Sequence, residues 1–248
     1  MQAKGPEIFG SNQPGLLMVG HGTRLIPGRV EFQETVELVK SLLPDAIVKA
    51  GFLEGGDPTI ASAWDDLLSC GVRRIIVSPR VLFAAGHAKR DIPEILGRLA
   101  EKSPLVHFRQ TPPLGCDPAL IELSVNRYQL ALATGPRQES RPPMRTRLLF
   151  VARGASDPVA RDQALEYAKL VAAAAKPDDQ ATCFLAMAKP TFDEAVSATR
   201  GSSFQRVVFV PHLLFSGALL QRVRDTVAEQ ERGGERQQWF LAVHLGSD

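Results

Sequence analysis

The sequence predicts an α/β protein made of two similar parallel-sheet, doubly wound domains. Two observations lead to this prediction: the chain repeats itself, and each copy alternates short apolar runs with longer amphipathic stretches. Strand–helix alternation is typical of a parallel sheet with right-handed crossovers. At 248 residues the chain is long enough for two domains that each bury a core.

The internal repeat has an offset of 132 residues, the distance from Leu16 to Leu148, and it runs without gaps over several stretches. The stretch LLMVGHGTR, which starts at Leu16, falls on LLFVARGAS. The stretch FLEGGDPTI, from Phe52, falls on FLAMAKPTF, and RIIVSPRVLF, from Arg74, falls on RVVFVPHLLF. A constant offset over this length indicates an internal duplication.

The apolar runs of the first copy are continuous rather than alternating, as in strands that are buried on both faces of a parallel sheet. We expect four such strands in this copy, at Leu16–Gly20, Ala46–Leu53, Arg74–Ser78 and Leu105–Gln110.

Helices fit between these strands. Asp57-Pro58 and Asp117-Pro118 each predict a helix N-cap followed by proline at the first helical position. Asp91 predicts the N-cap of a further helix, Ile92–Glu101.

The duplication also predicts the domain boundaries. Residues 135–146, GPRQESRPPMRT, are rich in proline and arginine and have no apolar period, so they are the expected linker. The N-terminal domain is then residues 1–134 and the C-terminal domain residues 147–248.

Composition excludes several classes of protein. The net charge is only +2 and no stripe of lysine and arginine appears, which argues against nucleic-acid binding. No apolar run approaches the roughly 18 residues that span a bilayer, and the opening MQAKGPEIFGSNQPG lacks the apolar core of a signal peptide. We therefore expect a cytoplasmic protein without a membrane partner. Cys70, Cys116 and Cys183 form no C-x-x-C pair, which predicts neither a disulfide framework nor an iron–sulfur cluster.

Three residues able to bind metal follow the predicted strands of the first copy. His21 follows the first strand, Glu54 ends the second, and His87 lies in the loop after the third. Because the carboxyl ends of parallel strands meet at one sheet edge, these side chains are expected to converge there. Two imidazoles and a carboxylate suit a divalent transition metal and leave coordination positions open. Whether Glu54 is a third ligand or a base remains open at this point.

The second copy lacks all three candidates. At the matching positions His21 becomes Arg153, Glu54 becomes Ala186 and His87 becomes Leu219, although the apolar strand residues are kept. The sequence therefore predicts one metal site, in the N-terminal half. His212 of the second copy aligns with Arg80.

Several motifs resemble a known family. They are GHGTR from Gly20, FLE with its Asp-Pro from Phe52, LFAAGHAKRDIP from Leu82, and PHLLFSGALLQRV from Pro211. Together with the duplication they resemble the class II tetrapyrrole chelatases, in particular the long-form sirohydrochlorin chelatases of the CbiX/SirB type. The resemblance covers nearly the whole chain and implies two chelatase-like domains.

The resemblance also implies an activity. It is ATP-independent insertion of a divalent metal into sirohydrochlorin, with His21 and His87 binding the metal and an acidic residue at Glu54. The product would enter cobalamin synthesis with cobalt or sirohaem synthesis with iron, and the resemblance favours cobalt. No cofactor is expected beyond the metal substrate. A two-domain chain need not form an oligomer.

The substrate carries eight carboxylates, which predicts cationic contacts. Candidate contacts are the basic residues in loops near the proposed ligands, together with residues at the matching edge of the second copy: Arg24, Arg29, Arg80, Lys89, Arg90, Arg153 and His212.

Two alternative functions compete with a chelatase. A non-catalytic metal carrier or tetrapyrrole-binding protein on the same fold would need the metal ligands but not cationic residues around them. A phosphoryl-transfer enzyme with a strand-end histidine would need an arginine cluster directly around that histidine, whereas here Gly20 precedes His21.

Overall fold

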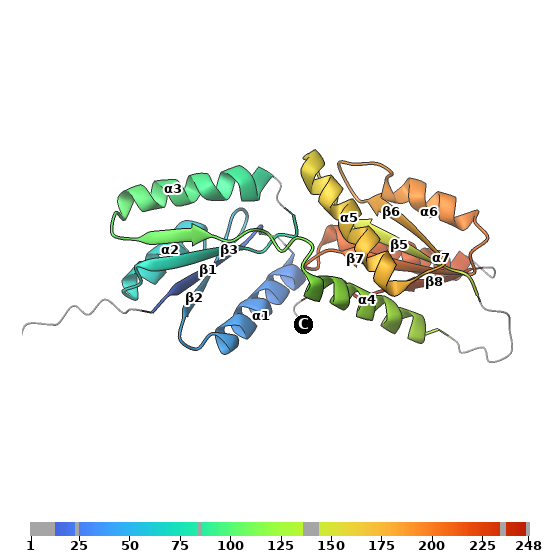
Figure 1. The fold of residues 1–248 in the computed structure, drawn as a ribbon, viewed down its shortest axis with the longest axis horizontal. Helices are drawn as coiled ribbons and strands as arrows, with labels where there is room; N and C mark the ends of the chain where they lie inside the picture. Colours follow the sequence, from blue (N-terminus) through green and yellow to red (C-terminus); the bar gives the residue numbers. More distant parts are fainter. Residues whose placement is uncertain (1–12, 23–24, 84–85, 136–143, 234–236, 247–248) are drawn as a thin grey trace, which may run out of the picture. The chain divides into compact units, whose positions relative to one another are not determined.

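The computed structural model of the chain describes residues 13–22, 25–83, 86–135, 144–233 and 237–246. Within this part the chain forms two four-stranded parallel sheets, each with helices on its faces (Figure 1). The predicted α/β class and the predicted parallel sheets are confirmed.

The first sheet has the strand order β2-β1-β3-β4. All four predicted strands are present, with ends that differ by two residues or fewer: β1 (Gly15–Gly20), β2 (Ile47–Phe52), β3 (Arg74–Pro79) and β4 (His107–Gln110).

Helices α1 (Ile26–Leu42), α2 (Ile60–Ser69) and α3 (Ile92–Lys102) accompany this sheet. Leu17 and Val77 belong to a buried core with Trp64 of α2 and Leu96 of α3, so α2 and α3 cover one face. Phe32 of α1 packs against Phe52 at the end of β2, on the other face.

The second sheet repeats the first, with the order β6-β5-β7-β8. Its strands are β5 (Thr146–Ala152), β6 (Asp179–Phe184), β7 (Arg206–His212) and β8 (Gln238–Leu241). Helices α5 (Pro158–Ala175), α6 (Phe192–Arg200) and α7 (Ala218–Gly233) follow β5, β6 and β7. The same strand order in both sheets supports the duplication found in the sequence.

Helix α4 (Pro118–Ala133) packs with the second sheet although its sequence belongs to the first repeat. Its Tyr128 and Ala131 are buried in a core with Leu148 and Val208 of the second sheet. The chain therefore separates into compact units of 1–81 with 86–113, and of 82–85 with 114–248. This division differs from the predicted boundary at residue 134, because the apolar face of α4 is buried against β7, β8 and α5. Residues 136–143 of the predicted linker lie outside the described residues.

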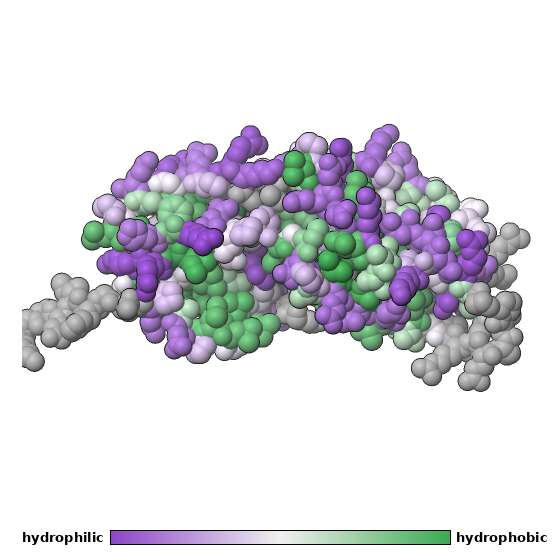
Figure 2. Space-filling model, in the orientation of Figure 1, coloured by the Kyte–Doolittle hydropathy of each residue, from purple (hydrophilic) through white to green (hydrophobic). Residues whose placement is uncertain are grey.

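Because α4 packs on the second sheet, the helices that cover the two sheets differ. In the second unit α4 and α5 lie side by side on one face (Figure 1). In the first unit α1 keeps exposed apolar residues, among them Leu38 and Leu42, and Figure 2 shows apolar surface over this helix.

The helix starts agree with the sequence only in part. Asp117 caps α4 as predicted, and its side chain accepts a hydrogen bond from Ala119 N at 2.8 Å. The prediction for Asp57-Pro58 is wrong: this pair is a cis peptide before the helix, and Thr59 is the cap of α2. Asp91 has helical backbone angles and makes no capping hydrogen bond, because a π-helical turn over His87–Asp91 runs directly into α3.

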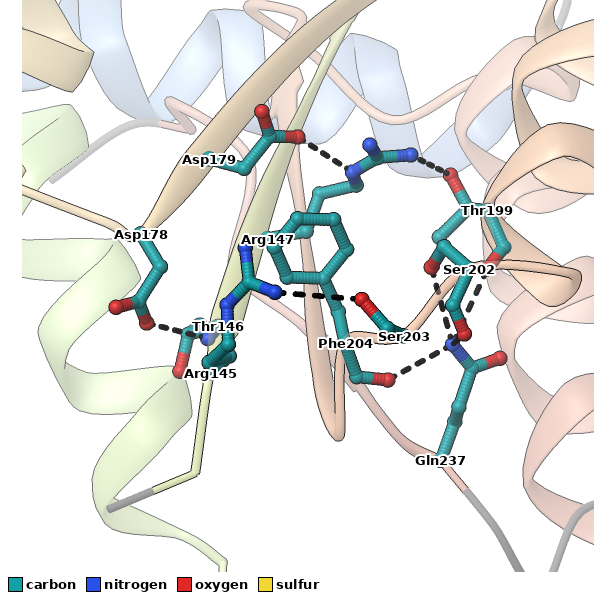
Figure 3. A network of polar contacts seen from close by, with 10 residues as sticks. All are labelled: Arg145, Thr146, Arg147, Asp178, Asp179, Thr199, Ser202, Ser203, Phe204 and Gln237. Carbon is teal, nitrogen blue, oxygen red and sulfur yellow. Dashed lines mark hydrogen bonds and ion pairs between the residues drawn. The ribbon is translucent and has the colours of Figure 1, made fainter.

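A polar network ties together the amino-terminal edge of the second sheet (Figure 3). The guanidinium groups of Arg145 and Arg147 lie 4.7 and 4.5 Å from the centre of the Phe204 ring. Arg147 also forms an ion pair with Asp179 at 2.6 Å, and Gln237 donates to the carbonyl of Phe204 at 2.9 Å. Ligands of such sheets bind beyond the opposite, carboxyl edge, so we assign this network to stability.

No helix in the described part of the chain is long and apolar enough to cross a membrane. The three cysteines are free thiols, and burial raises the pKa of Cys183 to about 12. A thiol in this environment behaves as a small apolar core residue.

Candidate metal site

His21 and Glu54 lie side by side at the carboxyl edge of the first sheet. The pairing of β1 with β2 continues beyond the strand ends, where Leu53 N donates to Gly20 O at 3.0 Å and Glu54 N donates to His21 O at 3.1 Å. His21 is half-buried and Glu54 is exposed. These hydrogen bonds hold the backbone of Glu54 against that of His21 at this edge, and the predicted convergence of their side chains on a metal ion stays a prediction.

Gly22 allows the two loops to approach this closely. Its φ is +100°, and a Cβ built at this position would lie 1.7 Å from Glu54 O. Only glycine fits such a contact and such a backbone conformation. The sequence showed a glycine beside His21 but not this contact. Its recurrence as Gly154 in the second repeat was the signal that could have revealed it.

The second repeat keeps the same backbone arrangement without the candidate metal ligands. Ala186 N donates to Arg153 O at 2.9 Å, and a Cβ on Gly154 would lie 1.9 Å from Ala186 O. Arg153 is exposed at the position that His21 holds in the first repeat. The backbone geometry of the edge is therefore a property of the fold, and the imidazole and the carboxylate are particular to the first repeat.

Arg80 is a candidate substrate contact at the same edge of the first sheet. Its backbone N donates to Val19 O at 2.7 Å, which places it directly after β3 at the same edge. The side chain is half-buried, burial lowers its pKa, and its Nε has no hydrogen-bond partner among the described residues. A partly desolvated guanidinium with an unused donor is suited to bind an anionic group.

The remaining candidates of the first repeat lie in two segments. Lys89 and Arg90 are exposed in the π-helical turn, which His87 begins, and Arg29 is exposed on α1. The side chain of His87, and Arg24 as a whole, lie outside the described residues. Their predicted roles stay predictions. Among the side chains that the structure describes, no cluster of three or more His, Cys, Asp or Glu residues is arranged to hold a metal ion.

His212 differs from the expectation that it contacts the substrate. It ends β7, but its side chain is only 2% exposed and lies among the rings of Phe150, Tyr167 and Phe83. Within the part of the chain that the structure describes, neither ring nitrogen has a hydrogen-bond partner. Burial lowers the pKa of this imidazole to about 3, so it is neutral at physiological pH. The alignment with Arg80 correctly predicted its place at the strand end but not the direction of its side chain.

The two repeats also match a known family. A family model described as CbiX matches residues 15–131 and again residues 147–248. The chain belongs to the CbiX family. Both matches keep the offset of the internal repeat, so the CbiX unit occurs twice in this chain.

Two named proteins are similar in sequence over most of the chain. A protein named sirohydrochlorin ferrochelatase from Priestia megaterium is 30% identical over 231 residues, which are 93% of this chain and 84% of that protein. A sirohydrochlorin cobaltochelatase from the same organism is 27% identical over 241 residues, 96% of this chain and 76% of its own length.

Among solved structures, SirB from Bacillus subtilis with Fe3+ superposes with a TM-score of 0.81 at 26% identity, over 94% of this chain and 89% of that protein. A SirB structure in complex with cobalt, from Bacillus subtilis subspecies spizizenii, has a TM-score of 0.76 at 24% identity. This match covers 95% of the present chain and 88% of that chain. This chain therefore shares its fold with SirB over nearly its whole length.

The contact at Gly22 leads to a prediction with an internal control. Gly22→Ala should separate the His21 and Glu54 loops, because its Cβ would meet a backbone carbonyl at 1.7 Å. We expect weaker Co2+ binding together with lower thermal stability. Gly154→Ala introduces the same conflict in the second repeat, which lacks the candidate metal ligands, so it should lower thermal stability alone. Equal Co2+ affinity in the two variants would show that the close contact at Gly22 has no effect on metal binding.

The buried imidazole predicts a pH dependence of stability. His212 has a lowered pKa of about 3 when folded and 6.5 as its ordinary value, so the unfolded chain binds more protons between these limits. The contribution of His212 to stability should thus fall as the pH drops below about 6.5. Thermal unfolding followed from pH 7 to pH 4 should show a smaller loss for His212→Leu than for the wild type. Parallel curves for the two proteins would contradict the neutral buried state.

Proposed function

We propose that this chain inserts a divalent metal, Co2+ or Fe2+, into sirohydrochlorin without ATP and without an iron–sulfur cluster. One observation supports this most directly. The first repeat presents an imidazole and a carboxylate on a backbone ladder that the second repeat keeps without either group. The ferrochelatase and cobaltochelatase named above, which match over most of their length, support the same assignment.

In this proposal the first repeat binds the metal. His21 and His87 supply neutral imidazole nitrogens, and Glu54 supplies a carboxylate, a donor set that accepts both cobalt and iron. Three protein ligands leave positions free, so water can be replaced by the pyrrolic nitrogens of the macrocycle. The exposure of Glu54 and the half-buried position of His21 leave both accessible to a ligand from solvent.

Proton removal is the second task. Metal insertion replaces two pyrrolic N–H protons by one divalent ion, so a nearby base accelerates it. Glu54 is an exposed carboxylate adjacent to His21, and it can accept such a proton and pass it to water. The same carboxylate can instead bind the metal, and the two roles are separated by the variant considered in the Discussion.

Binding of the substrate carboxylates falls to arginine and lysine side chains. Arg80 has a partly buried guanidinium with an unused Nε at the edge of the first sheet, whereas Lys89, Arg90 and Arg153 are exposed. Arg80 is the strongest of these candidates, because a guanidinium that has already lost part of its hydration gains more from pairing with a carboxylate. Arg24 keeps its predicted role as a further contact.

The decisive experiment is an insertion assay on sirohydrochlorin with Co2+, Fe2+ and Ni2+ in separate reactions. Loss of the metal-free absorption spectrum, together with proton release, is expected with Co2+ or Fe2+, and the ratio of initial rates identifies the preferred metal. Binding of metal or tetrapyrrole without any spectral conversion above the uncatalysed rate would instead indicate the carrier function.

A further inference from the structure

Arg80 carries a positive charge that no acidic group balances within the part of the chain that the structure describes. Burial lowers the pKa of its guanidinium, and no carboxylate among the described residues opposes this effect. Its Nε has lost contact with water without gaining a hydrogen bond there. A cation that is partly removed from water in this way gains free energy from an anion that pairs with it.

The backbone places Arg80 beside the candidate metal ligands of the first unit. Arg80 N donates to Val19 O at 2.7 Å, and Glu54 N donates to His21 O at 3.1 Å. These two hydrogen bonds lie on opposite sides of β1, so the ends of β2, β1 and β3 are neighbours at one edge. Since adjacent strands are about 4.8 Å apart, the backbone of Arg80 lies within about 7 Å of that of His21.

The second repeat has no charge at the position that matches Arg80. His212 occupies this position at the end of β7, and its burial among aromatic rings keeps the imidazole neutral. The second repeat also lacks the residues that match the candidate metal ligands. Of the two repeats, only the one with candidate ligands therefore has a charged side chain at this position.

We propose that the charge of Arg80 acts in opposite directions on the two substrates: it opposes binding of the divalent metal to the free chain, and it attracts a carboxylate of the tetrapyrrole, which neutralises it. This inference rests on the proposed function, which assigns the metal to His21 and Glu54. A nearby like charge disfavours a bound cation, and formation of an ion pair removes most of that repulsion. The chain then binds metal best after the tetrapyrrole has paired with Arg80.

Two titrations of the full chain test this proposal, one with Co2+ alone and one with metal-free sirohydrochlorin alone. Arg80→Gln removes the charge and keeps a polar side chain. It should bind Co2+ roughly tenfold more tightly, since a unit charge and a divalent ion about 10 Å apart repel each other in a partly buried site. It should bind sirohydrochlorin roughly tenfold more weakly, since a charge-assisted pair is lost. Arg80→Lys keeps the charge and should keep both affinities within a few-fold of the wild type.

Arg73→Gln is the matched control. Arg73 is an exposed arginine directly before β3, whereas Arg80 directly follows this strand, so the two lie about 23 Å apart along it. The control variant loses the same charge at the opposite edge of the sheet, and both of its affinities should equal those of the wild type.

The opposite signs of the two shifts separate an effect of charge from damage to the fold, which would weaken both titrations. Unchanged or weaker Co2+ binding in Arg80→Gln, or unchanged sirohydrochlorin binding, would overturn the proposal. Equal shifts in Arg73→Gln would do the same. Neither titration requires turnover. A wild type that binds both substrates but converts none would contradict the proposed insertion, while the test of Arg80 would still stand.

Discussion

His21→Ala should abolish most metal insertion while the protein stays folded. The imidazole is half-buried on a loop, and the hydrogen bond from Glu54 N is accepted by the backbone carbonyl of residue 21, which alanine retains. Residues that merely orient a metal ligand cost 10- to 100-fold when they are replaced, so removal of the ligand itself should cost at least about a hundredfold in insertion rate. The measurement is the initial rate of insertion at saturating sirohydrochlorin, beside the circular dichroism of the folded variant.

Arg153→Ala supplies the control for this substitution. Arg153 occupies the same place on the same backbone ladder in the second repeat. Its truncation should leave the maximal rate within a few-fold of the wild type and affect the apparent substrate affinity instead, because the residue is a candidate carboxylate contact only. If His21→Ala and Arg153→Ala lost the same fraction of the maximal rate, the proposal that only the first repeat binds the metal would be wrong.

Glu54→Gln should reveal which role the carboxylate has. Glutamine keeps the size and one oxygen of the side chain but loses its charge and basicity, and since Glu54 is exposed the fold should tolerate it. If Glu54 acts as the base, metal affinity stays near normal and the insertion rate falls by roughly a hundredfold or more. If it acts as a ligand, metal affinity falls first, and a higher metal concentration restores the rate.

Both quantities have to be measured on the same Glu54→Gln protein. Co2+ affinity comes from a spectroscopic titration without sirohydrochlorin, and the rate comes from insertion assays at several metal concentrations. Asp57→Asn, an exposed carboxylate three residues further along the same loop, controls for the general loss of negative charge. A normal affinity combined with a normal rate would remove Glu54 from the mechanism and leave the two histidines alone.

Much of the fold could be read from local pattern. The continuous apolar runs predicted all four strands of the first sheet within two residues, because a strand that is buried on both faces must be apolar along its whole length. Asp117-Pro118 correctly predicted the start of α4, because capping depends on neighbouring residues only. Asp57-Pro58 has the same two-residue pattern but lies before a helix that Thr59 caps, so that the pattern is not sufficient by itself.

The sequence by itself determined the duplication, the parallel sheets, and the adjacency of His21 and Glu54, since each follows from residue spacing and from the common direction of parallel strands. Tertiary structure alone decided that α4 packs on the second sheet, that His212 points into a ring cluster, and that Gly22 must lack a side chain. Periodicity shows that a face will be buried, and it does not show which distant surface buries it. That choice depends on which surfaces fit each other once the chain has folded, and here it determines where α4, Phe83 and His212 lie.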